Sequence, residues 1–152
     1  MGDNVSKTTD IGRNAMGTKI RRVQYFYAMV KDQPGEAYRL LTQLASSEVS
    51  LMAFKAIPMG PGLTQLVLFP DDVERLARAA EKTGVVLTGP NNAFLIHGDD
   101  RLGALIELHQ RLSDAHVNVY ASDGVTDGRG GYGYVLYVRP DEYETAAGIL
   151  GV

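Results

Sequence analysis

The chain has 152 residues, of which 45% are hydrophobic and 22% are charged, with a formal net charge of −3 and no cysteine. This length allows one domain or two small ones with a substantial core, and the composition is typical of globular proteins. The slight acidic excess gives no electrostatic reason to expect nucleic acid or an anionic membrane as a partner, and the lack of cysteine excludes disulfides and cysteine metal clusters.

No apolar run reaches the roughly 18 residues that a membrane span needs, and the N-terminus has no signal-peptide core. We therefore expect a cytoplasmic protein that does not associate with membranes. Residues 1–19 are dominated by small and polar residues and show no apolar period. We expect them to form a flexible N-terminal leader that takes no part in the fold.

Strands and helices alternate between residues 20 and 90, which we expect to form a first domain. Residues 22–30 are rich in β-branched and aromatic residues and predict a strand, and residues 34–46 carry apolar residues at helical spacing. The remaining expected elements are strands at 49–54 and 63–69, a helix that opens at 70–72 and closes at 83–84, and a short fourth strand at 85–87. This order predicts a ferredoxin-like βαββαβ unit.

The same order begins again in residues 91–152, the expected second domain. Asp100 and Gly103 repeat the positions of Asp32 and Gly35, about 70 residues further along the chain. Other matched pairs are Leu40 with Leu108, Leu44 with Leu112, Val49 with Val117, Ala53 with Ala121, Pro70 with Pro140 and Glu74 with Glu144. A repeat of this length indicates duplication of a whole small domain. The sequence thus predicts an α+β fold of two such units, each an antiparallel sheet with helices on one face.

The stretch Asp32-Gln33-Pro34-Gly35 lies where the first strand ends and the first helix begins. Pro suits the first turn of a helix, and an Asp beside it can accept hydrogen bonds from free backbone N–H groups. The same N–H groups and the helix dipole would attract a carboxylate. The corner therefore has chemistry suited to a small amphoteric metabolite, with a plain helix cap as the simpler reading of Asp32.

The same residues carry a family resemblance. Asp32-Gln33-Pro34-Gly35 with the helix that follows, and Val49-Ser50-Leu51 after it, resemble an ACT domain. The segment 103–108, with Leu112 and residues 117–119, resembles the ACT pattern more closely. Together the two copies are similar to small stand-alone tandem ACT proteins.

The resemblance implies a regulatory module that binds a free amino acid at an interface between ACT units. The site would combine the first strand-to-helix loop of one unit with the end of the second strand of its neighbour. It would use Asp32, Gln33, Pro34, Gly35, Glu36 and Phe54 in the first copy, and Asp100, Arg101, Leu102, Gly103 and Ser122 in the second.

Two departures from the pattern bear on this expectation. The second copy has Arg101-Leu102 where the first has Gln33-Pro34, so the two corners need not bind alike. The second copy also stops at Gly151-Val152, which leaves its last strand short or missing and exposes a sheet edge. We expect the leader or a partner chain to cover that edge.

A competing signature lies in residues 130–137, which imitate the aromatic third-strand motif of RNA-recognition domains. The position that normally carries a basic residue is Gly130, and the matching strand of the first copy, 63–69, has no such aromatic pattern. The simpler reading is that Tyr120, Tyr132, Tyr134 and Tyr137 serve sheet packing and an interface.

Catalysis has little support in the sequence. His97, His109 and His116 lack metal-ligand spacing, and neither a nucleophile elbow nor a phosphate-binding loop is present. We therefore expect a non-catalytic regulatory protein without metal or cofactor, which senses an amino acid, forms a homodimer and regulates a partner enzyme. The alternatives are an oligomerisation or protein-interaction module without ligand, and an RNA-binding domain.

Overall fold

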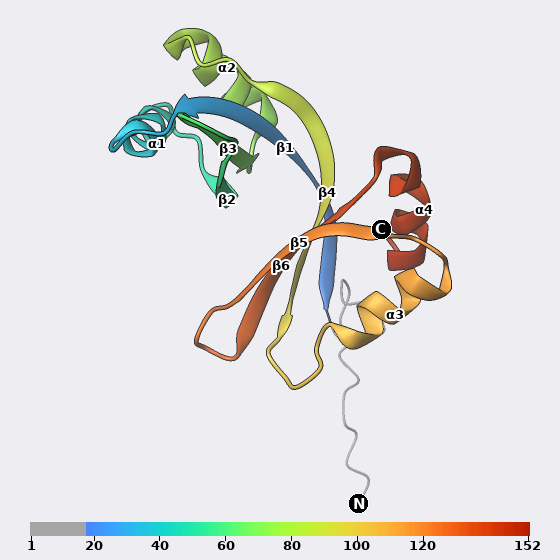
Figure 1. Cartoon of the computed structure of the whole chain (residues 1–152). Helices are drawn as coiled ribbons and strands as arrows, with labels where there is room; N and C mark the ends of the chain where they lie inside the picture. The colour runs from blue at the N-terminus through green and yellow to red at the C-terminus, as the bar shows by residue number, and fades with distance from the viewer. Residues whose placement is uncertain (1–17) are drawn as a thin grey trace, which may run out of the picture. The chain divides into compact units, whose positions relative to one another are not determined.

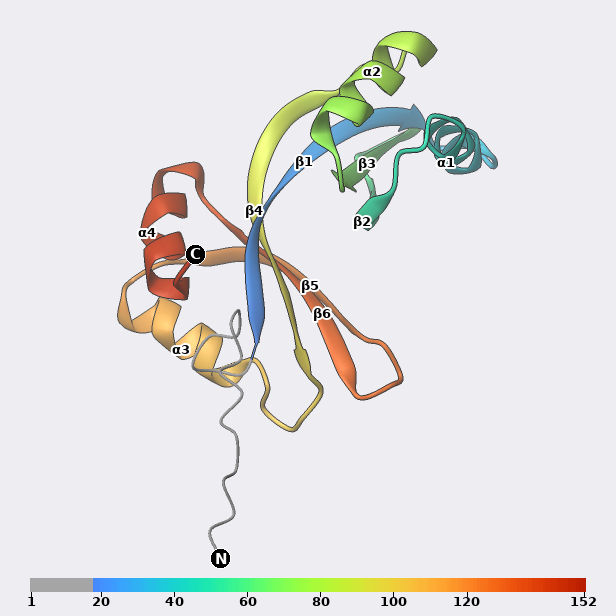
Figure 2. The same ribbon diagram turned by 180° about the vertical axis from the view of Figure 1, so that it is seen from behind.

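The structure is a computed structural model and describes residues 18–152 (Figures 1 and 2). The first half of the chain forms β1 (Lys19–Lys31), α1 (Glu36–Ser46), β2 (Leu51–Pro58), β3 (Leu63–Pro70) and α2 (Val73–Thr83). The second half forms β4 (Thr88–Asp99), α3 (Ile106–Asp114), β5 (Val119–Thr126), β6 (Gly131–Val138), the 3₁₀ helix η1 (Pro140–Glu142) and α4 (Tyr143–Leu150). The fold is α+β with ferredoxin-like βαββαβ order, as the sequence predicts.

The chain divides into two compact units. The first unit is Val23–Ala93, and the second unit joins Phe94–Val152 to residues 18–22. Strands follow the order β2-β3-β1-β4 in the first unit and β1-β4-β6-β5 in the second, because β1 and β4 each contribute residues to both units. Pairs β1–β3, β2–β3, β4–β6 and β5–β6 are all antiparallel.

The core of the first unit lies between its strands and two helices. Phe26 and Ala28 of β1 and Leu66 and Leu68 of β3 are buried on one sheet face, as their alternate spacing requires. The helices cover that face with Leu40 and Leu44 from α1 and with Leu76 and Ala79 from α2. Asp72 caps α2 by accepting a hydrogen bond from the Arg75 amide at 3.0 Å.

The second unit has its own core, built by the same rule. Phe94 and Ile96 of β4 and Leu136 of β6 lie on the face that α3 and α4 cover, and each is completely buried. The helices contribute Leu108 and Leu112 from α3 and Tyr143, Ala146, Ala147 and Leu150 from α4. The Phe94 and Tyr143 rings stack with centroids 4.6 Å apart.

Residues 85–87 are not a strand, which corrects the sequence-based expectation. The segment between Gly84 and Thr88 lies outside the sheet, and β4 begins only at Thr88. From there β4 continues without a break to Asp99, so the expected last strand of the first copy and the first strand of the second copy are one element. The local pattern of Val85-Val86-Leu87 indicated strand, but Val85 and Leu87 pack against the first core instead.

The start of β1 occupies the place of the strand that the second copy lacks. Chain order in the second unit ends with α4 and no strand follows it within the described residues, but β1 lies next to β4 in the sheet. Ile20 of β1 is a member of the second core, and Thr18 lies against Gly98 of β4. Residues 20–22, which the sequence assigned to the first domain, therefore group with the second unit; residues 1–17 of the expected leader lie outside the described residues.

Arg22 ties this first strand to the C-terminal helix. Its guanidinium donates to both carboxylate oxygens of Glu144, at 2.8 and 3.0 Å, and to the carbonyl of Val152 at 3.2 Å. It also lies over the Tyr143 ring, 5.6 Å from the ring centroid. The bidentate pair raises the pKa of Arg22 and lowers the pKa of Glu144, so both groups stay charged at neutral pH.

Backbone details recur between the two halves at the offset that the sequence comparison used. The Asp32 amide donates to the Gly62 carbonyl at 2.9 Å, and the Asp100 amide donates to the Gly130 carbonyl at 2.8 Å. Positive φ angles occur at Glu48 (57°) and at the matching His116 (58°). Both second strands carry a register shift at the same place, after Leu51 and after Val119.

The burial of Ile20 predicts that β1 stabilises the second unit. Ile20→Ala should lower the free energy of unfolding by about 2–5 kcal/mol, because it removes a buried side chain from the core and leaves a cavity. Arg21→Ala, a change at the exposed neighbouring position, should alter it by less than about 0.5 kcal/mol. Equal effects of the two substitutions in urea denaturation would show that β1 does not complete this core.

A second prediction concerns His97 of β4. Partial desolvation lowers the pKa of His97 although the residue is exposed, and the positive charges of Arg21 and Lys19 lower it further, so the fold favours the neutral ring. The associated stability is fully present above the unfolded-state pKa of about 6.5 and is lost as the pH falls through the lower folded-state pKa. An NMR titration should find a midpoint below that of a free histidine, raised in Arg21→Ala; a midpoint at or above about 6.5 would contradict this assignment.

Candidate functional site

The corner between β4 and α3 leaves backbone amides free at the start of a helix. Gly103 has φ 74°, a left-handed conformation that suits glycine, and turns the chain into α3. The Ala104 amide donates to the Arg101 carbonyl and the Ile106 amide to the Gly103 carbonyl, each at 3.0 Å. Among the described residues, the amides of Gly103 and Leu105 have no acceptor, and no side chain caps α3.

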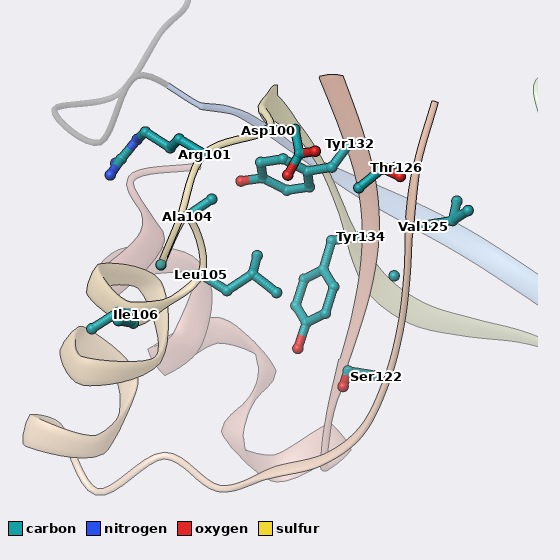
Figure 3. Close-up of a pocket in the computed structure, with 13 residues that line it drawn as sticks. Asp100, Arg101, Ala104, Leu105, Ile106, Ser122, Val125, Thr126, Tyr132 and Tyr134 are labelled. Atoms are coloured by element: carbon teal, nitrogen blue, oxygen red, sulfur yellow. The ribbon is translucent and has the colours of Figure 1, made fainter. Parts of the chain in front are cut away.

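A pocket of about 610 Å³ opens beside this corner, within the second unit (Figure 3). The 100–106 segment forms one wall, β5 forms the other, and β6 forms the floor. The lining residues are Asp100, Arg101, Gly103, Ala104, Leu105, Ile106, Ser122, Gly124, Val125, Thr126, Tyr132, Gly133 and Tyr134. The volume lies within the range of ordinary small-molecule sites.

The pocket carries groups of both charge signs at its mouth. Asp100 and Arg101 are exposed, and neither forms an ion pair or side-chain hydrogen bond with another described residue. In Figure 3 the Arg101 side chain extends away from Tyr134 and Ser122. Hydroxyl groups on Ser122 and Thr126 add neutral hydrogen-bonding capacity on β5.

Tyr134 of the pocket floor is packed and hydrogen-bonded to its neighbours. Its ring is 5% exposed, and its hydroxyl lies 2.8 Å from Nε2 of His109 on α3. The ring passes close over Gly124 of β5, where an added Cβ would lie 2.9 Å from the ring carbon Cδ2. The absence of a side chain at Gly124 therefore lets the Tyr134 ring pack directly against β5.

The structure brings together four of the five site residues expected in the second copy. Asp100, Arg101, Gly103 and Ser122 all line the pocket, whereas Leu102 points into solvent and is fully exposed. The sequence predicts Ser122 at the end of its strand, but β5 continues to Thr126. Ser122 reaches the pocket from the middle of the strand.

The corner of the first unit is built differently. The residue before α1 is Gly35, with φ 91°, and no side chain caps the helix, so Asp32 is not the helix cap that the sequence suggested. Asp32, Gln33 and Pro34 are exposed. Phe54 lies in the middle of β2, which continues to Pro58, and is 39% exposed.

Of the residues expected in the first corner, Glu36 lines a hollow in the described part of the first unit. That hollow, of about 390 Å³, lies between α1, the end of β1 and the segment before β4. Glu36 forms an ion pair there with Arg39 at 3.6 Å. The matching residue of the second unit, Ala104, carries no charge and leaves its corner free for a ligand.

Sequence reasoning missed the contribution of β6 and its partner on α3. Tyr132 and Tyr134 were interpreted as packing or base-stacking residues, and His109 as a packing residue. The sequence does contain a signal for this placement. Tyr132 and Tyr134 alternate with Gly131 and Gly133, so both rings lie on the same face of the sheet, the one that the helices cover.

The same burial removes the basis for base stacking on these rings. Tyr132 and Tyr134 are 8% and 5% exposed and belong to the second core, so neither presents a ring face to a base. Tyr137 is 6% exposed. Tyr120 alone of the four is substantially exposed, at 52%.

Neither a metal site nor a membrane span is found in residues 18–152. No three His, Asp or Glu side chains in that range gather closely enough to hold a metal ion. None of the helices there has the length and apolar character that crossing a bilayer requires.

The close contact at Gly124 yields a prediction. Gly124→Ala should force the Tyr134 ring to shift and cost about 1–3 kcal/mol of stability, because the new Cβ collides with a packed ring. Gly133→Ala is the matched control, since its Cβ would meet His97 at an ordinary 3.7 Å. Equal melting temperatures and equal Tyr134 resonances by NMR in the two variants would show that the Tyr134 ring does not pack closely against Gly124.

No family model and no curated protein matches the sequence. Solved structures do match in fold. A protein from Bacteroides thetaiotaomicron aligns with a TM-score of 0.74 at 13% identity, over 87% of this chain and 88% of that chain. The regulatory subunits of aspartate kinase from Thermus thermophilus (ligand-free form) and Thermus flavus align with TM-scores of 0.62 and 0.57, at 16% and 13% identity, each over 89% of this chain and 95% of that chain. The chain thus shares the ferredoxin-like α+β fold of these structures.

Proposed function

We propose that the chain is a non-catalytic regulatory protein, with two ACT units in tandem, that binds a free amino acid or a similar small metabolite. The pocket beside α3 is the observation that carries this proposal. It combines free backbone amides, a free carboxylate and a free guanidinium within one hollow of suitable size. The likeness in fold to regulatory subunits of aspartate kinase supports a regulatory role.

The charges of the pocket match those of an amino acid. Asp100 accepts hydrogen bonds from the ligand ammonium, and the amides of Gly103 and Leu105 donate to its carboxylate at the positive end of α3. Arg101 strengthens the attraction for the carboxylate. Charge-assisted hydrogen bonds contribute roughly 1.5–3 kcal/mol each when shielded from water, so a few suffice for micromolar to millimolar affinity.

The same proposal covers the corner of the first unit and the assembly of the protein. Asp32, Gln33, Pro34, Gly35, Glu36 and Phe54 form the matching corner, with weaker binding because Glu36 adds a negative charge where a carboxylate would lie. Binding at either corner acts by stabilising a homodimer or the contact with a regulated enzyme.

A screen of the twenty amino acids by thermal shift, followed by calorimetry, tests the proposal. At least one amino acid should raise the melting temperature, because a ligand that binds only the folded state stabilises it. Asp100→Asn should then weaken binding about tenfold or more, since it removes the charge that faces the ammonium. Asp32→Asn changes the matched position in the other half and should have a smaller effect. If no amino acid shifts the wild-type melting temperature, the proposed function is wrong.

A second candidate is an interaction module that works without a ligand. Exposed apolar side chains surround the pocket mouth: Leu102 is fully exposed, Val125 is 72% exposed and Ile106 is 68% exposed. The strand β5 beside them is at the edge of the sheet, where its outer backbone groups are open to pairing. A dimer that forms without ligand and is abolished by Val125→Lys, with no amino acid bound by the wild type, would favour this candidate.

A further inference from the structure

The hydroxyl group of Tyr132 is a hydrogen-bonding group of the pocket that comes from β6. The Tyr132 side chain is 8% exposed and lines the pocket from β6. Within the described residues its hydroxyl makes no hydrogen bond. The hydroxyl oxygen is not among the described side-chain polar atoms that are buried without a partner, so solvent reaches it and a ligand in the pocket can replace that water.

The surroundings hold this hydroxyl in place. It lies against Gly98 of β4, where an added Cβ would be 2.9 Å from the hydroxyl oxygen and 2.8 Å from the methyl group of Thr18. In Figure 3 the hydroxyl points toward the loop that carries Arg101 and Ala104. The packing thus aims the hydroxyl at the wall that offers free amides to a ligand.

The neighbouring Tyr134 provides a contrast on the same strand. It faces the same pocket and is buried to a similar extent, but its hydroxyl has a partner 2.8 Å away in Nε2 of His109. The protein therefore satisfies one of the two hydroxyls internally and leaves the other available.

We propose that the Tyr132 hydroxyl hydrogen-bonds the side chain of the bound ligand, and that the ligand is an amino acid whose side chain ends in a carboxylate or a carboxamide. This inference rests on the proposed function and deepens it. The α-amino and α-carboxylate groups are taken up by Asp100 and the free amides, so the Tyr132 hydroxyl recognises a further polar group. It determines specificity rather than the basic affinity for amino acids.

The charge around Tyr132 favours an acceptor on the ligand. Burial raises the pKa of Tyr132, so the hydroxyl keeps its proton at neutral pH and is available to donate. The positive charge of Arg101 lowers the pKa of Tyr132, whereas the negative charge of Asp99 raises it. A hydroxyl donor beside a guanidinium suits a carbonyl or carboxylate oxygen better than an ammonium group.

Tyr132→Phe tests the proposal because it removes the hydroxyl and keeps the ring in the core. The probes are L-glutamate, L-glutamine and L-norvaline, which have side chains of similar length with a carboxylate, a carboxamide and no polar end. Calorimetry on the full chain should find that the wild type binds glutamate or glutamine about tenfold or more tightly than norvaline. The variant should lose that preference while its affinity for norvaline is unchanged, and the glutamate and glutamine arms distinguish the charged from the neutral side chain.

Tyr134→Phe is the matched control. It removes a hydroxyl that is already bonded to His109, so it should lower the melting temperature and leave the preference among the three probes unchanged. A preference that survives in Tyr132→Phe, or a wild type that binds norvaline as tightly as the polar probes, overturns the assignment of Tyr132 while amino-acid binding stands. A wild type that binds none of the twenty amino acids overturns the proposed function and this inference with it.

Discussion

The second unit depends on a strand that the chain supplies from its beginning. Within the described residues no strand follows α4, and β1 takes the place beside β4 where backbone groups would otherwise be unpaired. Ile20 fills the core beside β4, and Arg22 holds Glu144 of α4 with two hydrogen bonds. These contacts complete the unit that carries the pocket, and they do so with residues far from it in sequence.

Local pattern predicted the elements well, because each helix and most strands carry their own periodicity. Leu40 and Leu44 of α1, and Leu108 and Leu112 of α3, are buried as helical spacing requires. The backbone hydrogen bonds that recur in the two halves join the residues that the sequence comparison matched. The boundaries between units could not be read in this way. The residues around Ile20 do not indicate which of the two cores it joins. Val85-Val86-Leu87 consists of residues that favour strands, but this segment is not part of the sheet.

The candidate site was predicted in part, for a physical reason. The Asp-x-x-Gly pattern marks a strand that turns into a helix, and that turn does leave free amides beside Asp100. The role of capping residue was wrong for Asp32, because glycine occupies the position before α1. The tyrosines of β6 were visible in the sequence, but only the tertiary packing shows that one hydroxyl is bonded and the other is free. Side chains that meet across strands leave no local pattern.

The central claim is that a small amphoteric ligand binds at the start of α3 in the second unit. Chemical-shift mapping of backbone amides by NMR, with the amino acid that most stabilises the protein, tests it most directly. We expect the largest shifts at Gly103 and Leu105, whose amides are free, and at Tyr132 and Gly133 on the floor of the pocket. Shifts confined to residues outside this pocket would contradict the account.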